Sequence, residues 1–177
     1  MTDIAPSREC GECTACCEGW LTGEIRGHKM MPGKNCHFLG CNRCTIYEER
    51  PQDPCRNFEC GWLQNKNNIV PEWMKPSKSK VMIKEMKYEV SMVQDWGGRA
   101  TYIMPTDTKL VTTVRYWNVV ECGETISGPV LNWLVQTCLL YDIPMIYEVA
   151  GKKEVIGPPE FHVWYEQSKK RQSQMTK

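Results

Sequence analysis

The sequence has no long apolar stretch and no secretion signal. It contains no run of 18 or more apolar residues, and its first ten residues, MTDIAPSREC, lack the basic start and the apolar run that direct a chain to export. We therefore expect a soluble, cytoplasmic protein with no membrane contact.

The sequence also has no excess of charge and none of the common enzyme motifs. With 22 basic and 21 acidic residues, the net charge of +1 provides no general attraction to nucleic acid or to an anionic membrane. A phosphate-binding glycine loop, a dinucleotide fingerprint and a Gly-x-Ser-x-Gly elbow are missing. No catalytic group of residues is recognisable, so the sequence leaves open whether the chain is an enzyme. The expected partner is an unknown protein or small molecule.

Cysteine is the residue that the sequence has in excess. Nine of the 11 cysteines lie between positions 10 and 60, in the blocks CGECTACC, CHFLGCNRC and CRNFEC. Two thiolates separated by two residues in a tight turn can bind one metal ion, and a second pair completes a tetrahedral shell. A disulfide framework is the alternative, but the odd number of cysteines in this region and the missing secretion signal favour chelation.

The adjacent pair Cys16 and Cys17 indicates more than one metal ion. Neighbouring side chains diverge, so we expect these two thiolates to bind different ions. Eight or nine ligands fit two nearby four-thiolate sites, a polynuclear cluster with shared sulfurs, or three zinc ions. Zinc is favoured over an iron–sulfur centre, although Cys36-x4-Cys41-x2-Cys44 matches the start of a plant-type ferredoxin pattern.

The order of the motifs resembles the YkgJ-type cysteine-cluster family, also described as CxxCxxCC or zinc- or iron-chelating domain proteins. The resemblance rests on CGECTACC at 10–17, CHFL at 36–39, CTIYEERP at 44–51 and CRNFECGW at 55–62. It implies eight metal ligands: Cys10, Cys13, Cys16, Cys17, Cys36, Cys44, Cys55 and Cys60.

Two details of the resemblance leave questions open. Cys41 is outside the implied set and stays an additional candidate ligand, and three residues instead of the usual two separate Pro51 from Cys55. A similar cluster occurs in flagellin lysine methylases, where an iron–sulfur centre is favoured over zinc.

Other side chains near the cysteines are expected to support the site. Arg50 and Arg56 should offset the negative charge of the thiolates from behind the ligands. His28 and His37 are expected at the surface or behind the ligands. Cys122 and Cys138, which stand apart from the blocks, are predicted to be buried structural thiols.

The chain divides into three parts by composition. Residues 1–63 form the cysteine-cluster metal-binding module, which cannot bury enough apolar surface to fold without cross-links. Residues 64–80 predict a linker or a connecting loop, and residues 81–177 an α+β region with a C-terminal helix. The fold class is therefore α+β: a loop-dominated, metal-stapled module packed on a small, mostly antiparallel sheet with two helices.

The α+β region shows both strand and helix patterns. Alternating β-branched and aromatic residues predict a hairpin over 80–96 with a turn at 85–87, a strand over 110–121, and two joined strands over 143–157. Ser127 and Pro129 predict the start of one helix, and Pro159 the start of another. The apolar faces of these helices carry Val130, Leu131, Leu134, Val135, Cys138 and Leu139 in the first and Phe161, Trp164 and Tyr165 in the second.

Three functions stay open at this point. The first is a metal-chelating protein whose module presents a binding surface. The second is an iron–sulfur protein that supports redox or protein-modification chemistry. The third is a zinc-ribbon-like adaptor for nucleic acid or assembly. We expect the first.

Overall fold

The computed structural model describes residues 8–41, 43–65, 69–94, 100–102, 110–123, 125–149 and 152–175. Short elements come first along the chain: η1 (Ala15–Glu18), β1 (Gly23–Ile25), β2 (His28–Met30), η2 (Tyr47–Glu49), η3 (Gln52–Arg56), α1 (Gly61–Gln64), η4 (Glu72–Met74) and α2 (Pro76–Ser79). Longer elements follow: β3 (Val81–Gln94), β4 (Ala100–Tyr102), β5 (Leu110–Glu121), α3 (Gly128–Tyr141), β6 (Met145–Val149), β7 (Lys152–Ile156) and α4 (Pro159–Met175).

The central sheet has the strand order β4-β3-β5-β6-β7. β3 and β5 pair antiparallel from Val81↔Glu121 to Met92↔Leu110, and β6 and β7 also pair antiparallel. The pairing of β5 with β6 is parallel, which requires a crossover, and α3 lies between these strands in the chain. A mixed α and β fold with a mostly antiparallel sheet is therefore confirmed, as are the strands at 110–121 and 143–157.

The hairpin predicted over 80–96 is wrong, because β3 runs through positions 85–87 without a turn. Those residues are Glu85, Met86 and Lys87, none of which favours a turn, and they pair with Trp117, Tyr116 and Arg115 of β5. The partner of β3 is thus a distant strand, with which it forms one long antiparallel ribbon.

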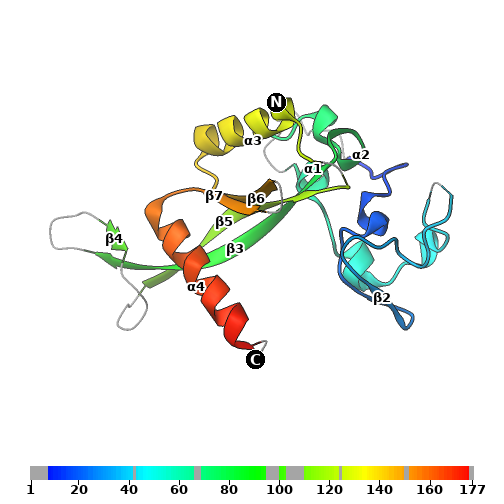
Figure 1. Cartoon of the computed structure of the whole chain (residues 1–177), viewed down its shortest axis with the longest axis horizontal. Helices are drawn as coiled ribbons and strands as arrows, with labels where there is room; N and C mark the ends of the chain where they lie inside the picture. Colours follow the sequence, from blue (N-terminus) through cyan, green and yellow to red (C-terminus); the bar gives the residue numbers. More distant parts are fainter. Residues whose placement is uncertain are drawn as a thin grey trace, which may run out of the picture.

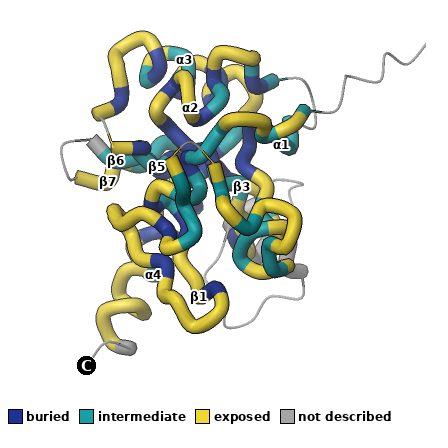
Figure 2. The backbone as a smooth tube through the Cα atoms, turned by 90° about the vertical axis from the view of Figure 1, so that its right-hand side faces the viewer, coloured by how far each residue is buried: buried dark blue, intermediate teal, exposed yellow. Residues whose placement is uncertain are grey.

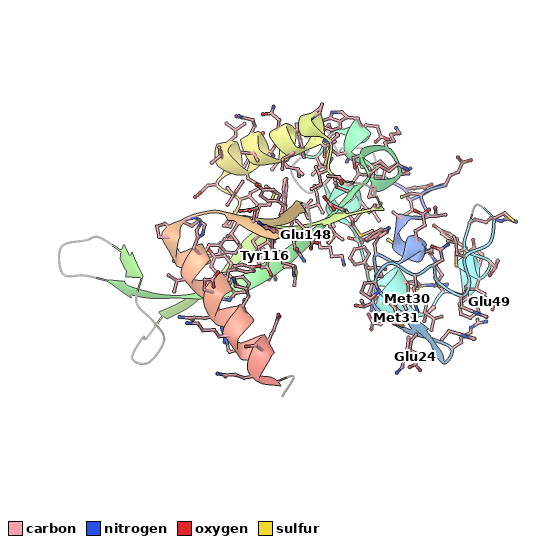
Figure 3. All side chains as sticks on the ribbon, in the orientation of Figure 1. Glu24, Met30, Met31, Glu49, Tyr116 and Glu148 are labelled. Atoms are coloured by element: carbon pink, nitrogen blue, oxygen red, sulfur yellow. The ribbon has the colours of Figure 1, made fainter. Side chains whose placement is uncertain are left out.

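The two long helices pack on opposite faces of the sheet, because alternate residues of a strand point to opposite sides. Ile83 and Val119 share a buried core with Leu134 of α3. Tyr88 and Tyr116, the latter labelled in Figure 3, share another with Phe161 of α4. Figure 1 shows α3 on one side of the long strands and α4 on the other.

The helix starts were predicted correctly, and one apolar face was not. Ser127 occupies the N-cap of α3 but makes no capping hydrogen bond with its side chain. Thr137 is buried on this helix, whereas Leu139, which was predicted to face the core, is 65% exposed. On α4, Phe161 and Tyr165 are buried as predicted.

The cysteine-rich segment (residues 8–63) lies at one end of the long strands (Figure 1). It contains the β1–β2 hairpin and a core of its own around Leu21, Ile25, Met30 and Cys36. Figure 2 shows that exposed and half-buried residues make up much of this segment. The stretch predicted as a linker contains η4 and α2, and Met74 there is 1% exposed and belongs to the core between α3 and the sheet.

Candidate metal centre

The first cysteine block forms two consecutive turns. The Cys13 amide donates to the Cys10 carbonyl at 3.0 Å, and the Cys17 amide donates to the Thr14 carbonyl at 2.7 Å. The second turn is η1, which ends at Gly19 with a left-handed φ of 93°. A Cβ on Gly19 would stand 2.5 Å from the backbone nitrogen of Lys34. Glycine at this position therefore lets the loop that precedes Cys36 lie against η1.

The second block is hydrogen-bonded to the first. The Cys36 amide donates to the Cys17 carbonyl at 2.6 Å, which fixes Cys36 next to η1. A bridge between Leu39 and Cys44 then folds the chain back on itself. Through these two contacts, residues that are 27 positions apart, Cys17 and Cys44, become neighbours.

The third block is anchored to the sheet. Cys60 is the N-cap of α1, and it is buried with 7% exposure. A Cβ on the next residue, Gly61, would lie 2.8 Å from Cγ2 of Ile83 on β3, so only glycine permits this close approach. Cys60 therefore sits where the cysteine-rich segment meets the strands.

Four thiols form what we call the first cysteine group: Cys10, Cys13, Cys16 and Cys60. Burial raises the pKa of Cys16, and the neighbouring thiols of Cys60, Cys10 and Cys13, followed by Cys17, raise it further. Burial also raises the pKa of Cys60, with Cys10 and Cys13 acting in the same direction. Cys16 and Cys60 are thus each near enough to Cys10 and Cys13 for thiolate charges to interact.

Four other thiols form the second cysteine group: Cys17, Cys36, Cys44 and Cys55. Burial raises the pKa of Cys17 to about 12, and Cys44, Cys36 and Cys55 contribute in the same direction. Burial raises the pKa of Cys55 as well, again with Cys36 and Cys44 as its thiol neighbours. The adjacent residues Cys16 and Cys17 thus belong to different groups.

A cavity of about 510 Å³ joins the two groups. Its wall includes every member of both groups except Cys60, together with apolar side chains such as Met30, which Figure 3 labels. Cys41 is exposed and is not part of this wall, and His28 and His37 are exposed and stack on each other at 3.6 Å between ring centroids. Seven of the eight cysteines implied by the resemblance therefore line one cavity, and Cys60 interacts with Cys10 and Cys13 from outside its wall.

Basic side chains surround the thiols. Arg50 donates through Nε to the Tyr47 carbonyl at 2.8 Å, and its guanidinium lies 3.5 Å from the centroid of the Tyr47 ring. From there it lowers the pKa of both Cys10 and Cys55, against the larger upward effect of burial. Arg56 donates to the Glu48 carbonyl and lines the cavity. Both arginines thus lie where they can offset thiolate charge, and Arg50 faces both groups.

Three basic or thiol side chains near the first group were not expected from the sequence. Lys75 lowers the pKa of Cys10, Lys84 interacts with Cys16, and Cys122 interacts with Cys13 and Cys60. Lys84 and Cys122 come from the sheet, and only the folded chain brings them near a block that is more than sixty residues earlier. No local pattern could have identified them.

The thiols suit a thiophilic metal ion, although the side chains do not form a complete coordination shell. All 11 cysteines are free thiols. Within the described residues, no three His, Cys, Asp or Glu side chains converge closely enough to hold an ion. Buried thiols with raised pKa values retain their protons unless a cation compensates the thiolate charge, and metal binding releases such protons. The cysteines are therefore chemically suited to bind a metal ion and lie in the same region. Their sulfur atoms would have to move closer together to coordinate it.

Comparison of the chain with family models, with curated proteins and with solved structures gave no match. The resemblance to the YkgJ-type family thus stays a prediction from the cysteine motifs. None of the helices in the described part of the chain combines the length and the apolar character needed to cross a membrane.

Proposed function

We propose that this chain is a metal-binding protein in which each cysteine group holds one metal ion through four thiolates. The observation that carries the proposal is the cavity whose wall includes seven of the eight candidate cysteines, with mostly different thiol neighbours around Cys16 and around Cys17. Four thiolates without an open position are typical of structural zinc sites, so we propose zinc as the ion in both groups.

In this proposal the metal organises the cysteine-rich segment. The segment has little regular structure, with β1 and β2 of three residues each, and its core consists of four buried residues and their partly buried neighbours. Such a core is too small to stabilise a fold by itself, and structural metal ions supply the missing free energy in small domains. The metal-bound segment would then present its surface to a protein or small-molecule partner.

Elemental analysis of the whole protein tests the proposal. The protein is purified under reducing, oxygen-free conditions without added metal, and zinc and iron are counted per chain. We expect two zinc ions in the natural sequence, one in Cys16→Ser, one in Cys17→Ser and two in the control Cys41→Ser. A folded protein without zinc or iron would overturn the proposal.

Iron with inorganic sulfide is the other informative result. An iron–sulfur cluster also takes four cysteine thiolates, so it would keep the two ligand groups and replace zinc as the occupant. The brown colour of such a cluster would separate the two results before any analysis of the metal.

A further inference from the structure

A second cavity, of about 440 Å³, lies where the pairing of β5 with β6 ends. The two strands pair in parallel only at residues 117–118 with 145–146, although both strands continue beyond this pairing. Residues 118–121 of β5 and 146–148 of β6 line the cavity. It therefore lies at the carboxyl ends of two parallel strands, where open sheets of α and β proteins commonly bind ligands.

Backbone groups of Glu121 face this cavity outside the ladder between β5 and β6. The Trp117 amide donates to the Pro144 carbonyl at 2.8 Å, so alternate residues of β5 direct their backbone groups toward β6. Glu121 belongs to this set, because the amide of the next residue, Cys122, donates in the opposite direction, to the Lys80 carbonyl at 2.7 Å. The pairing with β6 ends before Glu121, so its amide and carbonyl can bond to a ligand.

Two charged side chains of opposite sign line the cavity. Glu148 of β6, labelled in Figure 3, is half-buried, and Lys153 of β7 is exposed. They are register partners in the β6–β7 ladder, yet neither takes part in an ion pair within the described residues. A carboxylate that has lost part of its hydration is stabilised by a cationic partner. Glu148 therefore favours a ligand with a cationic group, and Lys153 one with an anionic group.

Apolar side chains complete the wall of the cavity. Trp20 of the cysteine-rich segment and Val120 of β5 are half-buried and line it. The Lys84 Nζ atom donates to the Trp20 carbonyl at 2.8 Å, which ties this part of the wall to β3. The cavity thus combines an apolar wall with one charge of each sign and with unused backbone groups.

We propose that this cavity binds a small zwitterion of the apolar α-amino acid class. The ammonium group of the amino acid lies at the Glu148 carboxylate and the Glu121 carbonyl, its carboxylate lies at the Lys153 ammonium group, and its side chain contacts Trp20 and Val120. The volume is within the range of about 300–1,000 Å³ that is typical of small-molecule sites. The inference is separate from the proposed metal binding, because none of the eight candidate cysteines, all of which the structure describes, lines this cavity.

Calorimetric titration of the whole protein tests the ligand class. The amino acids valine, leucine, isoleucine, methionine and phenylalanine are titrated one at a time, up to millimolar concentration. Each amino acid that binds is then compared with the amine that lacks its carboxylate and with the carboxylic acid that lacks its amino group. We expect at least one amino acid to bind and both of its analogues to bind about tenfold more weakly or worse, because each loses one charge-assisted hydrogen bond. No binding by any of the amino acids, or equal binding by an analogue, would overturn the proposal.

Neutral variants place the binding at this cavity. Glu148→Gln and Lys153→Gln keep the size of the side chain nearly unchanged and remove one charge, so each should weaken binding of the amino acid by about tenfold. Glu154→Gln is the matched control, because Glu154 is an exposed residue of the same hairpin that does not line the cavity. We expect this control to bind like the natural sequence.

The exposed position of Lys153 keeps the test informative if Glu148→Gln does not fold. Equal affinities of Lys153→Gln and Glu154→Gln would overturn the assignment to this cavity. Zinc content should be the same in all three variants and in the natural protein, so a failure here leaves the proposed metal binding intact.

Discussion

The two cysteine groups differ in what supports them. The first group lies against the sheet, because Cys60 shares the main core with Ile83 and Val119. The second group lies in the separate core around Leu21, Ile25 and Met30, which the cysteine-rich segment builds alone. Under the proposed function, we therefore expect apolar burial to hold the first group in place without metal and the second group to depend on its ion.

Metal removal should produce the largest difference between the groups. Apparent binding free energies of structural zinc in zinc-finger peptides are about 10–16 kcal/mol, which exceeds what a small core provides. After chelation we expect residues 21–56 to lose protection from amide hydrogen exchange, while β3, β5 and α4 keep theirs. Equal protection of all regions after complete zinc removal would contradict the comparison.

Removal of one second-group ligand should have the next largest effect. Cys55→Ala leaves three thiolates for one ion, so we expect the loss of one zinc ion and faster proteolysis within residues 21–56. Cys41→Ala is the matched control within the same segment, because Cys41 is exposed and outside the cavity wall. We expect this control to keep both ions and to change the free energy of unfolding by less than about 0.5 kcal/mol.

Two matched isoleucines separate the cores on which the groups rest. Ile25 and Ile83 are each 2% exposed, and truncation of such a side chain to alanine costs about 2–5 kcal/mol. Ile25→Ala should weaken zinc retention by the second group and leave the thermal unfolding of the sheet unchanged. Ile83→Ala should lower the melting temperature of the sheet, and the second group should retain its ion. The same result for both variants would show that the two cores unfold as one unit.

The smallest effect is expected at alkaline pH from a thiol outside both groups. Burial raises the pKa of Cys138 to about 12 from an ordinary value near 9. The unfolded chain then releases this proton at lower pH than the folded one, so the stabilisation is complete below pH 9 and decreases as the pH rises toward 12. Cys138→Ala should reduce the fall in unfolding free energy over this range by at most about 1.4 kcal/mol per pH unit, measured in denaturant titrations. A slope equal to that of the natural protein would contradict the assignment.

Local patterns predicted most of the regular structure. The alternation in residues 110–121 predicted β5, and Pro159 with its apolar face predicted α4, because both signals depend on neighbouring residues. The sequence did not predict that β3 runs without a turn, because its pairing with β5 determines this. Nothing in residues 85–87 indicates that β5 is the partner strand. Leu139 was misplaced because helical spacing does not reveal where the sheet beneath α3 ends.

For the candidate site, the sequence supplied the candidate ligands but did not show which of them lie together. The spacing of Cys10 and Cys13 indicates a chelating turn by itself. The association of Cys60 with that turn depends on the packing of α1 against β3, and that of Cys122 depends on the end of β5. Contacts of this kind join positions fifty to more than one hundred residues apart, and one sequence alone does not show them.

Arg50 interacts with a thiol of each cysteine group. If each group binds a divalent ion with four thiolates, each site has a net charge of about −2, and two such charges in one cavity repel. The guanidinium of Arg50 lowers the pKa of both Cys10 and Cys55, so it would weaken that repulsion. The two ions would therefore load with negative cooperativity, and the neutral side chain in Arg50→Gln would make the second ion harder to bind than the first.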